Sequence, residues 1–183
     1  MMRRWMVSAV VSLAGLMVPG VLVGQISGSA GASAANSLST EVQGRYAQVK
    51  GFVIKAAESM PAENYSYKPT PDIRTFARVV NHVTEAQFRA CGALNGAAAA
   101  KEAPPETADK ATIVDALKAS FAECDKAYAA TTDANMTEMV QVGQAKRSRL
   151  GILWGTVSHD NEQYATLALY MRLKGLVPPS SEK

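Results

Sequence analysis

GILWGTVSHDNEQYATLALYMRLKG, residues 151–175, is the stretch that decides the fold of this chain. Its residues return to one side at steps of four and three, which is the spacing of a single helix face. That face carries Ile152, Thr156, His159, Gln163, Thr166 and Tyr170. A second face carries Leu150, Leu153, Trp154, Val157, Tyr164, Ala168 and Met171. The pattern predicts one helix that is apolar on two sides and packs against several neighbours.

Two polar side chains interrupt the first of these faces. His159 and Gln163 are one helical turn apart and project the same way. A polar group on an inner face needs a hydrogen bond or a ligand, because an unpaired group costs about 1–3 kcal/mol. The other histidine in the chain, His82, falls in another segment with helical spacing. Both histidines are therefore expected where helices pack, and we interpret them as parts of one site.

Periodicity predicts two helices in the first half of the chain. Apolar residues at steps of four and three place a first helix at about residues 38–60. The proline-rich segment 61–71 then leads into a second helix, for which Thr70 or Asp72 is the expected cap and Pro71 a first-turn residue. The second helix presents Val80, Val83, Gln87, Cys91 and Leu94 on one face.

A third helix is expected to begin near Asp109 or at Thr112, after a loop over residues 96–109. Residues 131–144 form a longer connection, and the last helix is predicted to begin near Lys146. No stretch alternates between apolar and polar residues with hairpin signals at its ends, so no strand is predicted. Four helices in one domain favour an all-α fold, an antiparallel four-helix bundle.

The N-terminus has the three parts of a secretory signal peptide. Arg3 and Arg4 precede the uncharged apolar run 5–18, and small residues follow up to Ala34. We predict a signal peptide over residues 1–34 and a bundle domain over residues 35–183, which makes the protein exported, either periplasmic or secreted. The alternative is an uncleaved N-terminal anchor, which would be the only membrane contact.

Composition narrows the classes of partner. Without residues 1–34 the chain is close to neutral, and its Lys and Arg residues are scattered apart from Lys146, Arg147 and Arg149. Nucleic-acid binding normally needs a broad basic face, so no nucleic-acid partner is expected. A small-molecule ligand remains open, and so does the oligomeric state, since a dimer is compatible with the sequence but not required by it.

The two cysteines, Cys91 and Cys124, lie on the second and third predicted helices. Because disulfides persist in exported proteins, we predict a disulfide between them. Two separate buried thiols are the alternative. A catalytic or metal-binding cysteine is disfavoured, since neither has a histidine or another cysteine at ligand spacing.

Several short motifs resemble those of one family when they are taken in order. They are Met60-Pro61, the run Tyr65–Pro71, Arg74-Thr75-Phe76, Asn81-His82-Val83, and the stretch from His159 to Pro179. Together they are similar to the exported branch of the DinB family. The resemblance implies a four-helix bundle with one divalent metal, often nickel or zinc. It also implies three histidine ligands, one on the second helix and two a turn apart on the last. Some relatives are thiol-dependent transferases or isomerases.

The chain departs from this pattern at one ligand. His82 and His159 match the first two histidines, but Gln163 stands where the third is expected. An amide oxygen is a poorer ligand for zinc or nickel than an imidazole nitrogen, so the site is expected to be weakened. Glu85 and Glu162, each three residues after a histidine, either contribute to the site or form ion pairs with nearby arginines.

Two functional hypotheses follow from these residues. The first is an exported metal-dependent hydrolase or thiol transferase of unknown substrate, with a metal held by His82, His159 and Gln163. The alternative is a degenerate, non-catalytic bundle that binds a small ligand or a protein partner without metal.

Overall fold

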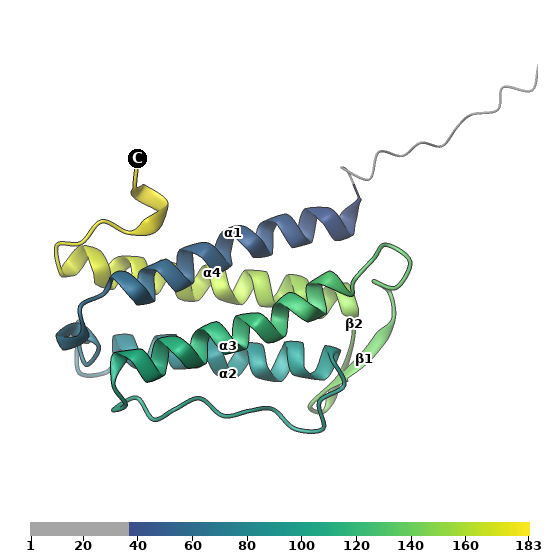
Figure 1. Cartoon of the computed structure of the whole chain (residues 1–183), viewed down its shortest axis with the longest axis horizontal. Coiled ribbons are helices and arrows are strands. Elements are labelled where there is room, and N and C mark those ends of the chain that lie inside the picture. The colour runs from purple at the N-terminus through teal and green to yellow at the C-terminus, as the bar shows by residue number, and fades with distance from the viewer. Residues whose placement is uncertain (1–36) are drawn as a thin grey trace, which may run out of the picture. The chain divides into compact units, whose positions relative to one another are not determined.

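Four helices form a bundle in the computed structural model, which describes residues 37–183 (Figure 1). They are α1 Leu38–Ser59, α2 Phe76–Leu94, α3 Lys110–Ala129 and α4 Arg149–Leu173. The all-α four-helix bundle predicted from the sequence is confirmed. The predicted signal peptide over residues 1–34 lies outside the described residues.

The helices do not simply alternate in direction. The segment between α2 and α3 runs back along the bundle, so these two helices point the same way (Figure 1). Their contacts agree with this direction, because Gln87 and Cys91 of α2 meet Ser120 and Cys124 of α3 in the same order. Helices α1 and α4 are also parallel to each other, and both run opposite to α2 and α3. The two helices that carry the histidines, α2 and α4, are therefore antiparallel to each other.

Each of the four helices begins with a side-chain cap. Ser37, Thr75, Asp109 and Ser148 each accept a hydrogen bond from the backbone N–H three residues later, which satisfies a free donor of the first turn. Asp109 was one of the two predicted starts of the third helix.

The predicted start of the second helix was wrong, since neither Thr70 nor Asp72 caps α2. The segment before α2 contains a short 3-10 helix, η2 Ala62–Asn64, and then folds back on itself. The carbonyl of Tyr67 accepts from the N–H of Phe76 at 2.9 Å and the carbonyl of Tyr65 from that of Ala77 at 2.9 Å. These bonds satisfy the first donors of α2 and place its start several residues later than predicted.

A β-hairpin precedes α4, although no strand was predicted. Strands β1 Met139–Val142 and β2 Ala145–Ser148 pair antiparallel, with Val142 opposite Ala145. Gly143 and Gln144 form the two-residue turn, and Gly143 has φ +58, which glycine adopts without strain. The predicted helix start near Lys146 was therefore wrong, because Lys146 belongs to β2. Both strands are short and mostly exposed, so they carry little apolar alternation.

Side chains from all four helices fill the core. The large residues that are almost completely buried include Val49 and Val53 of α1, Phe76 and Val79 of α2, Ile113, Leu117 and Phe121 of α3, and Leu153, Leu167 and Met171 of α4. Cys91 and Cys124 form a disulfide within this core, with a Cα–Cα distance of 4.9 Å, as the sequence predicted. Trp154 was predicted to pack on the second apolar face of α4, but it is 55% exposed.

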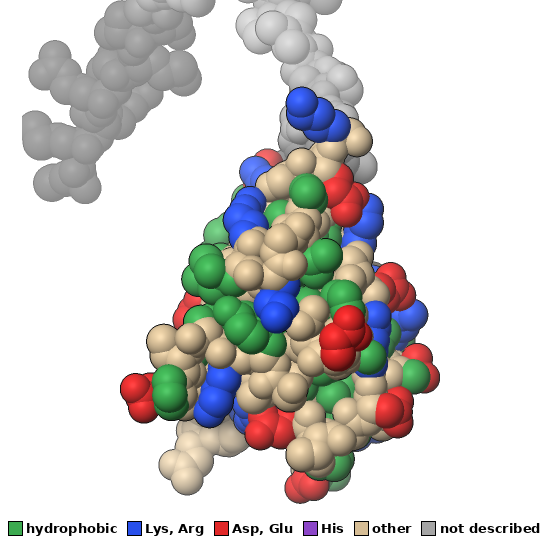
Figure 2. All heavy atoms as spheres, turned by 90° about the vertical axis from the view of Figure 1, so that its left-hand side faces the viewer, with side chains coloured by type: hydrophobic (Ala, Val, Ile, Leu, Met, Phe, Trp, Pro, Cys, Tyr) green, Lys and Arg blue, Asp and Glu red, His purple; other side chains and the backbone are tan. Residues whose placement is uncertain are grey.

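The end of the bundle that carries the α1–α2 connection and the C-terminal segment is polar and mixed in charge. Figure 2 shows this end, with acidic and basic side chains interspersed among hydrophobic ones and no histidine visible. The short helix η3 Pro179–Ser181 returns to the bundle here, and the Ser180 N–H donates to the Tyr164 hydroxyl at 2.8 Å. No helix within residues 37–183 has both the length and the apolar character to cross a membrane.

Candidate metal centre and adjoining cavity

The two histidines meet between α2 and α4. The rings of His82 and His159 lie edge to face, with centroids 4.9 Å apart and planes at 63°. Two imidazoles that bind one tetrahedral ion through bonds of about 2.0–2.1 Å have ring centroids about 5 Å apart. The separation of the two rings is compatible with a shared divalent metal, and it is equally that of an ordinary edge-to-face ring contact.

The two ring nitrogens of His159 have different surroundings. Nδ1 lies 3.4 Å from the Oδ1 atom of Asp160, a long contact at the edge of hydrogen-bonding distance. Nε2 is buried and has no hydrogen-bond partner among residues 37–183. A buried ring nitrogen without a partner is costly, and a metal ion would satisfy it. A carboxylate on the other nitrogen is the usual arrangement around a metal-bound histidine.

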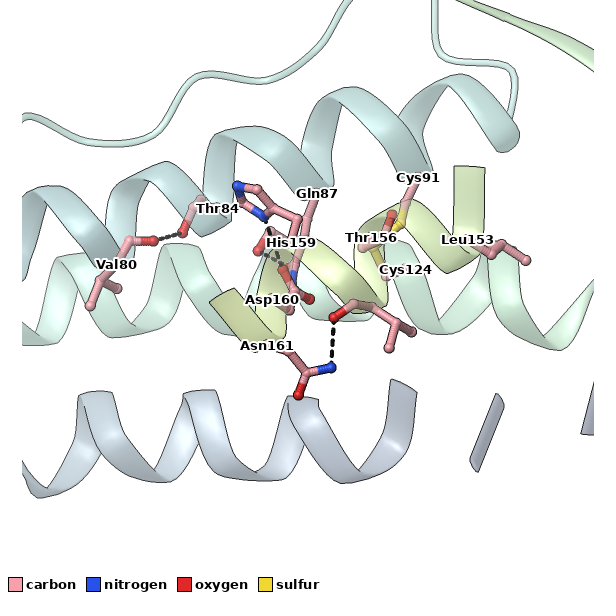
Figure 3. Close-up of polar contacts among 12 residues, drawn as sticks. Val80, Thr84, Gln87, Cys91, Cys124, Leu153, Thr156, His159, Asp160 and Asn161 are labelled. Carbon is pink, nitrogen blue, oxygen red and sulfur yellow. Dashed lines mark hydrogen bonds and ion pairs between the residues drawn. A yellow bond between two sulfur atoms is a disulfide. The ribbon is translucent and has the colours of Figure 1, made fainter. Parts of the chain in front are cut away.

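Asp160 is completely buried, and a chain of side chains holds it in place (Figure 3). The Nε2 amide of Gln87 donates to the Oδ2 atom of Asp160 at 3.0 Å, and the Ser120 hydroxyl donates to the Oε1 atom of Gln87 at 2.7 Å. Burial raises the pKa of Asp160, while the contacts with His159 and Gln87 act against that rise. The chain joins α4, α2 and α3 behind the histidine pair.

The sequence analysis did not assign Asp160 to the site, although a signal was present. Asp160 continues the second apolar face of α4, three residues after Val157 and four before Tyr164. A carboxylate at a core position of a helix, next to a histidine, is rare unless it has a partner or a function. Its partners, however, come from α2 and α3 and are visible only in the folded chain.

His82 has a more basic environment than His159, which lies beside Asp160. Burial and the nearby charge of Arg74 lower the pKa of His82, and His159 adds to this shift. The His82 imidazole is therefore neutral at neutral pH, which is the form that binds metal.

The two carboxylates considered from the sequence do not join the histidines. Arg78 donates two hydrogen bonds of 2.9 Å to Glu85, so Glu85 forms the ion pair that was the alternative interpretation. Glu162 is exposed on α4. Within the described part of the chain, no cluster of three or more His, Cys, Asp or Glu side chains is placed to hold a metal.

Gln163 lies one turn after His159 on α4 and is 7% exposed. Its side-chain amide makes no hydrogen bond to any residue between 37 and 183. An amide oxygen suits zinc or nickel less well than an imidazole nitrogen, so the weakened site expected from the sequence stays a prediction.

A cavity of about 330 Å³ adjoins the histidine pair on the side of His159. It lies between the second half of α2, the hairpin and the first half of α4. A larger groove of about 870 Å³ runs between the first halves of α1 and α4, but no histidine lines it. Of these two, the smaller cavity is therefore the one that a histidine of the pair lines.

The fold and the site together define an all-α four-helix bundle in which a histidine of α2 meets a histidine of α4. The sequence model of the DinB superfamily matches residues 48–167. The chain belongs to this superfamily, as the sequence motifs indicated.

Solved structures show the same fold. A DinB-like protein from Bacillus cereus ATCC 10987 is 20% identical, with a TM-score of 0.64, and the match covers 78% of this chain and 96% of that one. A DinB-like protein from Bacillus subtilis is 14% identical, with a TM-score of 0.58 and coverage of 74% and 92%. A conserved protein from Enterococcus faecalis is 13% identical, with a TM-score of 0.60 and coverage of 75% and 96%. No curated protein matches.

Proposed function

We propose that the domain binds one divalent metal ion, nickel or zinc, as the weakened centre of a hydrolase or thiol transferase. The observation that carries this proposal is the histidine pair, with centroids 4.9 Å apart and a buried, unpartnered Nε2 atom on His159. His82 and His159 would hold the ion, and the Gln163 amide oxygen would be the third, weaker ligand. Such an ion would lower the pKa of a bound water or thiol and so provide a nucleophile near neutral pH.

The residues around the pair have supporting roles in this proposal. Asp160 holds the His159 ring through Nδ1 and so directs Nε2 toward the ion. Gln87 and Ser120 in turn fix the Asp160 carboxylate. Glu85 is engaged in an ion pair with Arg78, so it is not assigned as a ligand. None of these groups is assigned a step in a reaction.

Metal analysis of protein purified without a histidine tag tests the proposal. We expect one equivalent of nickel or zinc after equilibration with the metal, and loss of that equivalent in His82→Ala. Circular dichroism should show that His82→Ala is folded, since His82 is only partly buried. A wild-type protein that takes up no metal under metal-replete conditions would contradict the proposal.

Gln163 provides a second and more specific test. Gln163→His should raise the metal affinity by more than about tenfold, because losing even a supporting group costs about 10–100-fold. Gln163→Leu, the matched control, removes the donor at similar size and should lower the affinity. Equal affinity in all three proteins would show that residue 163 does not reach the ion.

The alternative function, a non-catalytic bundle that binds a small ligand without metal, also has an observation in its favour. Gln163 replaces an imidazole, and the cavity beside His159 is large enough for a small molecule. The two functions separate by metal uptake, because a protein that binds a small ligand but takes up no nickel or zinc under metal-replete conditions supports the alternative.

We also propose that the protein is exported. The disulfide between Cys91 and Cys124 supports this, because such bonds persist in oxidising compartments. The signal-like residues 1–34 are the second support. N-terminal sequencing of the protein from a cell-envelope or culture fraction should find a start near Ala35. An intact residue 1 on cytoplasmic protein would contradict export.

A further inference from the structure

The charged side chains that line the cavity beside His159 are all positive. Arg89 of α2 and Arg147 of β2 are exposed and line it, and no Asp or Glu is among its lining residues. Within residues 37–183, no carboxylate lies within ion-pair distance of either arginine, whereas Arg78 and Arg149 both have acidic partners. Two unpaired guanidinium groups beside one concave site attract an anion.

Apart from Thr156 and His159, the remaining walls of the cavity are small or apolar. Ile152 and Val142 supply apolar surface, and Ala86 and Ala90 keep the α2 side shallow. Gly155 of α4 also lines the cavity, and a Cβ atom built on it meets no other atom within 4 Å. The space in front of Gly155 is therefore open and belongs to the cavity.

We propose that this cavity binds a small organic carboxylate, with the carboxylate on Arg89 and Arg147 and an apolar body against Ile152 and Gly155. A planar guanidinium matches a carboxylate through two parallel hydrogen bonds, and the apolar wall beside the arginines favours an anion with an apolar body over inorganic phosphate. The cavity volume of about 330 Å³ is at the lower end of the range for small-molecule sites and limits the ligand to about the size of an aromatic acid.

The hairpin has a defined part in this site. It was not predicted from the sequence, and yet it supplies one of the two arginines and the wall residues Val142 and Ala145. The α2–α4 pair alone would leave His159 beside an open surface. The hairpin turns that surface into a cavity and brings a second positive charge to it.

NMR titration of the metal-free protein in EDTA tests the carboxylate site at low ionic strength, with benzoate as the probe. We expect benzoate to shift the amide resonances of Gly151 and Gly155, and benzamide, its neutral counterpart, to bind at least about fivefold more weakly. Inorganic phosphate should bind more weakly than benzoate. Benzamide or phosphate binding as tightly as benzoate would overturn the proposal.

Variants locate the site. Arg89→Ala and Arg147→Ala should each weaken benzoate binding about threefold or more, because exposed ion pairs contribute modestly, and the double variant more than either. Arg45→Ala, which removes an exposed charge of α1 outside this cavity, is the matched control and should leave binding within about twofold. Unchanged binding in the double arginine variant would refute the site.

Gly155 gives a test that keeps every charge. Gly155→Leu should fill the cavity and weaken benzoate binding by more than about tenfold, while Gly155→Ala adds one methyl group and should have a small effect. Both substitutions raise helix propensity, so loss of the fold is not expected. Full binding by Gly155→Leu would contradict the cavity as the site. Because these titrations use metal-free protein, their failure would not affect the proposed metal function, and absence of metal binding would not affect them.

Discussion

Asp160 holds a carboxylate at a completely buried position of the bundle. A carboxylate without solvent exposure loses its hydration, and burial raises its pKa. Hydrogen bonds offset part of that loss, since Gln87 donates to Asp160 and is itself held by Ser120. The stability of the domain therefore depends on keeping the Gln87 amide satisfied, more than on the negative charge itself.

We expect Asp160→Ala to destabilise the domain by about 1–3 kcal/mol, because the Gln87 amide would be buried without an acceptor. Asp160→Asn keeps an acceptor oxygen and removes the buried charge, so it should be at least as stable as the wild type. Urea denaturation at pH 7 in EDTA measures both.

The neighbouring residue supplies the control for this prediction. Asn161 donates only to the Val157 carbonyl of its own helix, so Asn161→Ala should change the free energy of unfolding little. Equal losses in Asp160→Ala and Asp160→Asn would show that the acceptor for Gln87 is not what matters at this position.

At the scale of elements, the start of α1 is fastened by a residue that is distant in sequence. Asp133, in the turn after α3, accepts a hydrogen bond of 2.9 Å from the backbone N–H of Ser39. Ser37, the residue directly before α1, caps the same turn. The first turn of α1 is thus tied both to its own cap and to the end of α3.

This contact predicts a pH dependence. Hydrogen bonds from Ser39 lower the pKa of Asp133 below its ordinary value of 3.8. A carboxyl with a lowered pKa in the folded state contributes stability above its unfolded pKa and loses it as the pH falls through the folded pKa. Asp133→Ala should therefore lower the melting temperature at pH 7, and the difference from the wild type should shrink below about pH 3 to 4.

Asp115→Ala is the matched control for Asp133, because Asp115 lies on the exposed face of α3. It should leave the melting temperature nearly unchanged at both pH values. A deficit of Asp133→Ala that is the same at pH 7 and at pH 3 would mean that the ionised carboxylate is not the stabilising group.

At the scale of the whole molecule, the parallel arrangement of α2 and α3 requires a long connection. Residues between these helices return along the bundle, where the side-chain amide of Asn81 donates to the Pro104 carbonyl at 2.7 Å and the Thr75 hydroxyl to Glu106 at 3.0 Å. Near the other end of the two helices the disulfide joins Cys91 to Cys124, 33 residues apart. Both ends of the crossover are therefore anchored.

Reduction of this disulfide should lower the free energy of unfolding by about 3–4 kcal/mol in the chain-entropy estimate. Chemical denaturation with and without a reductant measures the effect. The double variant Cys91→Ala with Cys124→Ala serves as the control, because its stability should not respond to the reductant. A wild-type protein that is equally stable in both conditions, or that has two free thiols when unfolded without reductant, would contradict the prediction.

Much of the fold could be predicted because it depends on local patterns. Steps of three and four between apolar residues indicated the helices, and Asp109 marked one helix start correctly. The hairpin was missed because its strands are short and exposed, although Gly143 between Val142 and Ala145 was a usable signal. Similarly, the cap of α2 depends on how residues 61–75 fold back, which no local pattern specified.

Some residues of the candidate site could likewise be predicted from the sequence, and others could not. The single-turn spacing of His159 and Gln163 and the helical position of His82 were evident in the sequence, and the two histidines do meet. Asp160 was missed because its partners lie on two other helices. The arginines of the cavity come from α2 and from the hairpin, so their proximity to His159 could not be inferred from spacing.

The amino-acid sequence by itself determined the four helices, the family, the cysteine pair and the departure from a three-histidine site at Gln163. These depend on residue type and on short-range periodicity, which do not change with the packing of the chain. Only the tertiary structure decided the parallel course of α2 and α3, the burial of Asp160 and the cavity beside His159. Each of these is set by contacts between segments that are distant in sequence, because side-chain volume and hydrogen-bond satisfaction are settled only when the helices pack.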